Sequence, residues 1–266
     1  MSEEKYFASQ EKDEVERKRM ALLGAAYDPA TVRQLEALGV SEGWKCLEVG
    51  AGRGSIAQWI ANTVGLKGKV VATDVNVRFL RDLDLPNLEV REHNILTDPI
   101  EVGSYDLVHA RMVLMHLPEP EKAVKRMSDA LRPGGWLFIE DSDFGSCLSM
   151  NMTDSRLDAL VAMLRSMNSF YEEKGVYHPY FGRNEPRFLE QLGFVDIGHQ
   201  GWVQAFHGGE PLAEYNCMAF QYLKYRLLSA GLSTQQEVDD VERYLSDPSI
   251  TFIDQTVFGA WGRKPE

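Results

Sequence analysis

The stretch LEVGAGRGS, residues 47–55, decides the fold of this chain. An apolar run ends in three glycines, Gly50, Gly52 and Gly54, and a helical stretch at 56–64 follows. Glycines between a strand and a helix allow a tight turn and let a ligand approach the backbone. A phosphate-binding GxGxxG turn has the same shape, so the glycines alone leave a nicotinamide-dependent oxidoreductase open.

The pattern of strand, turn and helix repeats on both sides of this turn. We expect a helix at 119–131 and strands at 45–49, 69–73, 88–92, 105–110 and 136–139. A parallel connection needs a crossover that a helix usually supplies, so strands alternating with helices indicate parallel pairing. The predicted fold class is α/β, with a doubly wound, mostly parallel sheet.

The chain outside residues 41–141 has a different character. Residues 1–40 are predicted to form an N-terminal helical arm, with one helix at 11–27 and a second that Asp28 caps and Pro29 opens. Residues 142–266 are expected to supply a late strand or hairpin at 194–206, a final strand at 252–261, and helical insertions at 153–170, 186–192, 212–228 and 234–245. We interpret these insertions as a lid over the sheet, and the whole of 1–266 as a single domain.

Charge and cysteine content restrict the partners and the compartment. Lys and Arg number 28 and Asp and Glu 40, so the formal net charge is −12. An acidic surface repels phosphate backbones and anionic lipid, which disfavours nucleic acid and membrane partners. Cys46, Cys147 and Cys217 are far apart and form no CxxC, which argues against a zinc ribbon or a disulfide framework. With no long apolar window either, we expect a soluble, cytoplasmic protein.

Two acidic residues distinguish the glycine turn from a dinucleotide site. Glu48 lies two positions before the first glycine, where a carboxylate would repel a pyrophosphate and attract an ammonium group. The GxGxG spacing points the same way. Asp74 ends the second predicted strand, the position from which an acid reaches the ribose hydroxyls of an adenosine. A solvent-facing Glu48 and a helix-capping Asp74 are the alternatives; together the two acids indicate a site for an adenosine that carries an amino acid.

From Trp44 to Asp141 the sequence resembles the class I S-adenosylmethionine-dependent methyltransferases of the small-molecule type. LEVGAGRGS matches the first motif of that family, and VVATDVN matches the acidic end of its second strand. YDLVHARMVLMHLPEP matches the fourth strand and the loop after it, and ALRPGGWLFIED matches the turn into the fifth strand. The resemblance implies a Rossmann-like fold, S-adenosylmethionine as the cofactor and S-adenosylhomocysteine as the product.

The resemblance also implies a set of cofactor-binding residues. It places Glu48 at the methionine amino end, Gly50, Ala51 and Gly52 along the cofactor, Asp74 on the ribose, Val75 on the adenine, Asn94 and Ile95 at the adenine edge, and Ala110 and Arg111 at the amino acid part. Many family members have Asp in place of Asn94, whose amide oxygen can still accept a hydrogen bond from the adenine. Arg111 has an alternative role as a structural cation paired with Glu48 or another acid.

Methyl transfer is a direct displacement, so the main task of the enzyme is to align nucleophile, carbon and sulfur. A base is needed only for a protonated acceptor. His116 is the first candidate, because it follows the fourth strand by six residues and an imidazole titrates near neutrality. In related sugar and small-molecule methyltransferases a matching His is implicated in catalysis. The alternative is a buried, structural His116.

Asp141 is the second catalytic candidate and belongs to an acidic patch with Glu140 and Asp143 at the end of the fifth strand. One of these acids could orient His116, accept a proton or bind Mg²⁺. Metal-dependent catechol-type relatives need carboxylates from more than one strand end, so we expect no metal. His109 is expected to pack or to bond to backbone.

The acceptor pocket is expected to come from the arm and the late insertions, which are rich in Tyr and Met. Met150 and Met152 are among these residues, although core packing explains them equally well. Tyr6 could fold over the cofactor or belong to a frayed end. The predicted function is methyl transfer to a small or medium-sized, partly apolar metabolite, at oxygen first and in secondary metabolism. The alternatives are N- or C-methylation, a cofactor-binding protein with another reaction, and an NAD(P) oxidoreductase. The oligomeric state is open, with a homodimer as one option.

Overall fold

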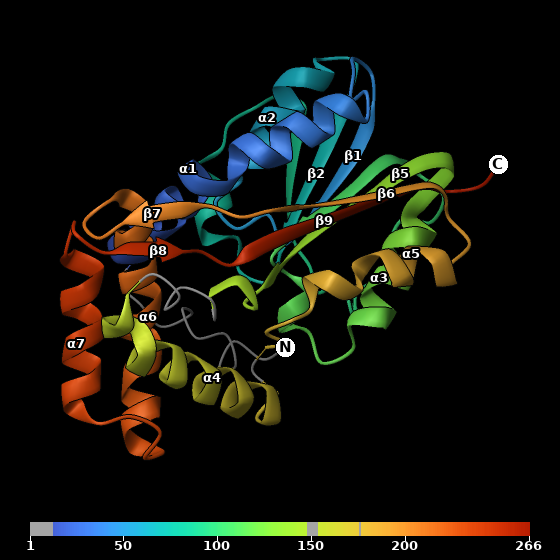
Figure 1. Cartoon of the computed structure of the whole chain (residues 1–266). Helices are drawn as coiled ribbons and strands as arrows, with labels where there is room; N and C mark the ends of the chain where they lie inside the picture. Colours follow the sequence, from blue (N-terminus) through green and yellow to red (C-terminus); the bar gives the residue numbers. More distant parts are fainter. Residues whose placement is uncertain (1–12, 148–153, 176) are drawn as a thin grey trace.

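The computed structural model describes residues 13–147, 154–175 and 177–266 (Figure 1). Its centre is a seven-stranded sheet in the order β3-β2-β1-β4-β5-β9-β6. The strands are β1 (Lys45–Val49), β2 (Lys69–Asp74), β3 (Leu88–Glu92), β4 (Tyr105–Arg111), β5 (Leu131–Asp143), β6 (Val195–Trp202) and β9 (Thr256–Arg263). Strand β9 is antiparallel to both of its neighbours, and the other strands are parallel to one another. The doubly wound, mostly parallel α/β sheet predicted from the sequence is confirmed.

Helices cover both faces of the sheet, because successive residues of each strand point to opposite faces. The end of α1 (Asp13–Ala37) and all of α2 (Ser55–Val64) pack on one face with Cys46 of β1. Helices α3 (Pro120–Ala130) and α5 (Glu185–Gln191) pack on the other face with Leu47 of β1. Two separate apolar cores result, one on each side of the sheet.

The arm differs from the prediction in one respect, because α1 runs without a break from Asp13 to Ala37 and Pro29 lies inside it. The expected second helix, capped by Asp28, is therefore wrong. The Asp28 carboxylate accepts a hydrogen bond from the Arg111 guanidinium instead of capping. Proline removes one backbone hydrogen bond from a helix, and the burial of Tyr27 and Leu35 on either side offsets that loss.

A cap of three helices and a small sheet lies against one end of the main sheet (Figure 1). It consists of α4 (Asp158–Glu173), α6 (Pro211–Ser229), α7 (Gln235–Ser246), and the paired strands β7 (Ala205–His207) and β8 (Thr251–Ile253). The late run predicted at 194–206 contains two strands, β6 and β7, and the run predicted at 252–261 contains β8 and β9. The chain leaves the main sheet after β6 and re-enters it at β9. Four short 3₁₀ turns complete the described elements: η2 (Val77–Asp82), η3 (Leu114–His116), η5 (Ser155–Leu157) and η6 (Gly182–Asn184). Among the described residues, no helix is long and apolar enough to cross a membrane.

Candidate functional site

A cavity of about 380 Å³ lies between the sheet edge and the cap. It extends over the carboxyl ends of β1, β2 and β4, where the order of the strands in the sheet reverses between β1 and β4. Ligands of open α/β sheets bind in the crevice at such a reversal. Ten of the twelve site residues predicted from the sequence line this one cavity: Glu48, Gly50, Ala51, Gly52, Asp74, Val75, Asn94, Ile95, Arg111 and His116.

The glycine turn after β1 is shaped by close packing as well as by its backbone angles. Gly50 has φ +67, and a Cβ there would stand 2.3 Å from a methyl group of Val113. Gly54 has φ +82, and its Cβ would stand 2.4 Å from a methyl group of Leu83. Any side chain at either position would displace its neighbour, so the turn keeps an open backbone surface toward the cavity.

Asp74 at the end of β2 is held against the glycine turn. Its carboxylate accepts hydrogen bonds from the backbone N–H groups of Gly52 and Asn76, both at 2.9 Å. Burial raises the pKa of Asp74 above its usual value, while the backbone donors oppose that shift. The carboxylate therefore has a defined orientation at the rim of the cavity.

Asn94 and Ile95 follow β3 and, like Val75, line the cavity. The amide oxygen of Asn94 already accepts a hydrogen bond from the backbone N–H of Leu96 at 3.0 Å. A carbonyl oxygen has two lone pairs, so one further donor can still be accommodated. The side chain thus closes a local turn, a role that the sequence did not reveal.

Glu48 faces the cavity and is also bonded to His109 behind it. The distance from Glu48 Oε2 to His109 Nδ1 is 2.7 Å, and His109 Nε2 lies 3.0 Å from Oε2 of Glu140. Burial opposes a charge on this ring, but the two carboxylates outweigh it and raise the pKa of His109 to about 9. His109 is fully buried and packs on Phe138, as one of the two expected alternatives has it, but its ring nitrogens bond to two acids and not to backbone.

Arg111 lines the cavity, but its guanidinium is committed to α1. It donates hydrogen bonds to the Asp28 carboxylate at 2.6 Å and to the Thr31 hydroxyl at 2.8 Å. Arg111 therefore has the structural role given above as the alternative to cofactor binding, and the acid with which it pairs is Asp28. Ala110 is buried inside β4 and does not line the cavity.

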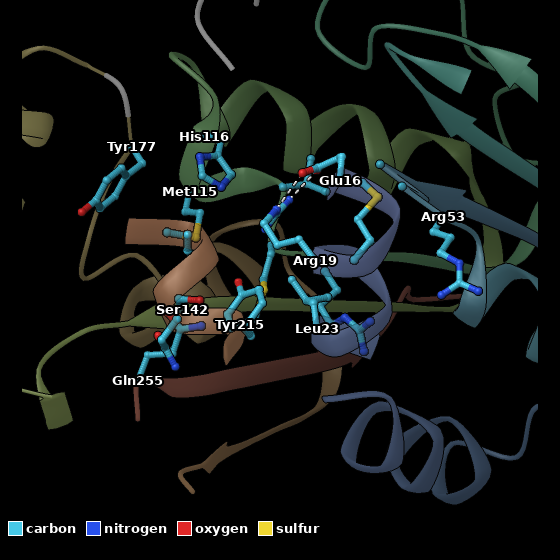
Figure 2. Close-up of a pocket in the computed structure, with 18 of the residues that line it drawn as sticks. Glu16, Arg19, Leu23, Arg53, Met115, His116, Ser142, Tyr177, Tyr215 and Gln255 are labelled. Carbon is cyan, nitrogen blue, oxygen red and sulfur yellow. Dashed lines mark hydrogen bonds and ion pairs between the residues drawn. The ribbon is translucent and has the colours of Figure 1, made fainter. Parts of the chain in front are cut away.

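His116 lies in η3, is half-buried and lines the cavity near Met115 and Tyr177 (Figure 2). Its ring is 6.3 Å from the ring of Tyr177, in an edge arrangement. The backbone carbonyl of Met115, the preceding residue, accepts a hydrogen bond from the backbone N–H of His178 at 2.7 Å. That bond, together with the one from the His116 N–H to the Val113 carbonyl, fixes the turn that carries the imidazole.

Asp141 does not reach the cavity. It is fully buried behind η3, where its Oδ1 accepts a hydrogen bond from the backbone N–H of Met115. Its other oxygen and both oxygens of Glu185 find no donor among the described residues. Burial raises the pKa of Asp141 to about 8 and that of Glu185 well above its usual value. Two adjacent carboxyl groups in this state retain a proton between them.

The predicted acidic patch lies at the expected strand end, but its three members serve different partners. Glu140 bonds to His109 and Thr31, while Asp141 supports η3 on the other face of the strand. Asp143 accepts two hydrogen bonds from the Arg183 guanidinium. Within the described ranges, no three His, Cys, Asp or Glu side chains gather as they would around a metal ion.

The wall opposite the glycine turn is largely apolar and comes from the cap. Its residues on α4, α6 and α7 are Leu160, Met163, Leu164, Met167, Ala219, Phe220, Leu223, Val241 and Leu245. Of the late tyrosines, Tyr177 and Tyr215 line the cavity. Tyr6, Met150 and Met152, which the sequence also suggested, lie outside the described residues.

Several polar lining residues were not anticipated. Glu16 and Arg19 form a buried ion pair on α1 at 2.7 Å, drawn as a dashed line in Figure 2. Asp254 and Gln255, between β8 and β9, bond to the hydroxyl of Tyr27 on the arm, with 2.5 Å between Tyr27 and Asp254. These last contacts join segments more than 200 residues apart, and no local pattern in the sequence signals them.

Comparisons with known proteins agree with this geometry. Residues 47–139 match the family model described as a methyltransferase domain. The chain is 32% identical over 182 residues to Methyltransferase str2 of Strobilurus tenacellus, covering 67% of this chain and 63% of that protein. It is 31% identical over 105 residues to a ubiquinone biosynthesis O-methyltransferase of Albidiferax ferrireducens, covering 36% of this chain and 40% of the other.

Solved structures show the same fold. The YcgJ protein of Bacillus subtilis matches with a TM-score of 0.58 at 14% identity, covering 90% of this chain and 100% of the other. The chain spans less than two thirds of the length of the first curated relatives that it matches. Residues 47–139 match a methyltransferase domain, and the comparisons support the resemblance of the chain to the class I S-adenosylmethionine-dependent methyltransferases.

Proposed function

We propose that this chain transfers the methyl group of S-adenosylmethionine to a small or medium-sized, partly apolar metabolite. One observation carries the proposal: a single cavity is lined by both the glycine turn and the apolar wall of the cap. His116 lines it at their junction, three residues after the Val113 that packs on Gly50 and with its ring 6.3 Å from that of Tyr177. A cofactor and an acceptor bound in the two parts would share that junction.

The residues at the sheet edge fit this cofactor. Gly50 and Gly52 leave backbone exposed, the Glu48 carboxylate suits the ammonium group, and the Asp74 carboxylate suits the ribose hydroxyls. Val75 offers an apolar surface for the adenine and is 38% exposed. When bound, S-adenosylmethionine supplies an electrophilic methyl group on a sulfonium ion.

The residues of this chain then have two tasks. The apolar wall excludes water and holds the acceptor in line with the methyl group, an alignment that is worth about 7 to 11 kcal/mol in favourable cases. His116 removes the proton of an acceptor hydroxyl, for which an imidazole is suited near neutral pH. Asp141 acts behind it by holding the backbone of η3.

Oxygen is the proposed acceptor atom. A hydroxyl needs a base, which His116 can supply, and one of the relatives carries the name of an O-methyltransferase. N- or C-methylation is the first alternative, and a non-methylation reaction supported by the same cofactor is the second. A role in secondary metabolism rests on the aromatic, Met-rich cap, and three free cysteines favour a reducing cytoplasm.

The test is a panel of hydroxyl- and amine-bearing metabolites scored by release of S-adenosylhomocysteine, after calorimetry with that product. We expect the product to bind and at least one apolar hydroxyl compound to turn over. Tight binding of NAD(P) without binding of S-adenosylhomocysteine would indicate an oxidoreductase. Turnover of a true substrate without release of S-adenosylhomocysteine would show that the chemistry is not methyl transfer.

A further inference from the structure

Behind the glycine turn, a chain of hydrogen-bonded polar side chains, most of them ionisable, runs through the interior from the sheet to the arm. It begins at Glu48, passes through His109 to Glu140, and continues through Thr31 and Arg111 to Asp28. The successive donor–acceptor distances are 2.7, 3.0, 2.8, 2.8 and 2.6 Å. The side chains of Glu48, His109 and Glu140 are at most 5% exposed.

The geometry of His109 restricts its protonation state. Both ring nitrogens lie within hydrogen-bonding distance of a carboxylate oxygen. A neutral imidazole has one N–H, so its other nitrogen would direct a lone pair at a carboxylate. Only the imidazolium donates to both acids at once. The Phe138 ring, 5.0 Å away, is the aromatic neighbour of this ring and carries no charge.

The charges in this chain do not cancel. Glu48, Glu140 and Asp28 contribute three negative charges, while the imidazolium of His109 and the guanidinium of Arg111 contribute two positive ones. The remaining negative charge is unbalanced, and Glu48 is the acid of the trio that lines the cavity. A cation placed against Glu48 would complete the balance.

We propose that His109 is a positioning residue: as an imidazolium clamped between Glu48 and Glu140, it holds Glu48 ionised and directed at the amino group of the cofactor. The role rests on the proposed function, since it needs a ligand with an ammonium group. Without the imidazolium, two buried carboxylates would lack the cation between them, which disfavours the ionised form of both at once. Glu48 would then offer a weaker charge to the ligand.

The first experiment measures the charge directly. In the full chain labelled with ¹⁵N-histidine, we expect one of the six imidazoles to remain an imidazolium at pH 8, and that signal to vanish in His109→Gln. In Glu140→Gln the amide can donate to the ring, so His109 should become neutral while it keeps its bond to Glu48. A His109 ring that is neutral at pH 8 in the unaltered chain would overturn the proposal.

The second experiment separates positioning of Glu48 from general support of the fold. Calorimetry compares S-adenosylhomocysteine with 5′-methylthioadenosine, which has the same nucleoside and thioether but no amino acid group. In His109→Gln we expect the affinity for S-adenosylhomocysteine to fall about tenfold or more. The affinity for 5′-methylthioadenosine should stay unchanged.

Each other outcome has a defined meaning. An equal loss for both ligands, or no loss for either, would overturn the positioning role. Failure of the unaltered chain to bind either ligand would overturn the proposed function and this role with it, which differs from a selective loss. If His109→Gln does not fold, Glu140→Gln provides the test: a neutral His109 in that variant with no selective loss of affinity for S-adenosylhomocysteine over 5′-methylthioadenosine contradicts the proposal.

Discussion

The two walls of the cavity are built on different principles. The cofactor wall consists of strand ends and turns, and its polar side chains are held by backbone groups or by one another, as with Asp74 on Gly52 and Glu48 on His109. The acceptor wall consists of helices from the cap, and its side chains are mostly apolar and held only by packing. The cofactor wall therefore presents hydrogen-bonding groups at fixed positions, whereas the acceptor wall presents mainly an apolar surface of a certain shape.

For the proposed cofactor and acceptor, this difference indicates which wall should discriminate more strongly between similar ligands. Hydrogen bonds in a defined geometry select one ligand strongly, because a wrong ligand leaves buried polar groups unpaired. An apolar wall with methionines adapts to several shapes and discriminates weakly between similar ones. Changes to the two walls should accordingly give different and separable effects.

The largest effect is expected at the junction of the two walls. His116→Ala should lower kcat by roughly 10²-fold or more, the usual scale for the loss of a general base, while the affinity for S-adenosylhomocysteine is kept. Steady-state kinetics with a turned-over acceptor and product calorimetry measure the two quantities. His199→Ala, at an exposed position of β6, is the matched control. An unchanged kcat would remove His116 from the mechanism.

A change confined to the cofactor wall should act on binding. Asp74→Ala should weaken the binding of S-adenosylhomocysteine by about 10- to 100-fold, because a charge-assisted hydrogen bond contributes about 1.5–3 kcal/mol. The kcat at saturating cofactor should change much less. Calorimetry checks the affinity, with the exposed Asp84→Ala as control. Equal affinity in the two variants would mean that Asp74 only braces the glycine turn.

The buried acid pair behind η3 should act on stability. A carboxyl group whose pKa is raised in the folded state binds a proton that the unfolded chain has released. Stability should therefore fall as the pH rises from about 4 to about 8, by about 1.4 kcal/mol per pH unit for one retained proton. Glu185→Gln cannot ionise and can donate to Asp141, so this dependence should shrink.

Urea unfolding between pH 5 and pH 8 measures that effect. We expect Glu185→Gln to be more stable than the unaltered chain at pH 8 and the difference to be smaller at pH 5. Glu190→Gln, an exposed position on the same helix, controls for the loss of one charge. If the slope of stability against pH is the same in all three proteins, the pair does not retain a proton.

The smallest effect is expected on the acceptor wall. Met163→Leu conserves volume and should cost less than about 1.5 kcal/mol of stability. It should shift the acceptor KM by a few-fold through the shape of the wall, with the affinity for S-adenosylhomocysteine unchanged. Met218→Leu, which does not line the cavity, is the control. A loss of cofactor affinity would show that the two walls are not independent.

The strands and the glycine turn were predictable because their signals are local. Strand β1 and strand β3 have the bounds expected from the sequence, and the turn at 50–54 needs glycine at each end for reasons of packing and backbone angle. The continuous α1 was not predictable, because Pro29 normally marks a helix start and only tertiary burial keeps the helix intact.

The residues of the candidate site also fall into those that the sequence predicted and those that it did not. Ten residues predicted from motifs line one cavity, because the parallel strands bring their carboxyl ends to one edge. Asp141 was expected there as well, but successive residues of a strand alternate between faces, and its carboxylate lies behind η3. Glu185, its partner from α5, carried no signal in the sequence that linked it to Asp141.

By itself, the sequence determined the α/β class, the cofactor-binding turn and the acids beside it, since each depends on residues that are neighbours along the chain. Only the tertiary structure decided what those acids touch. The clamp of His109 between Glu48 and Glu140 joins three strands, and the cavity wall joins the arm to α6. Contacts of this kind depend on the packing of distant segments, which no local spacing encodes.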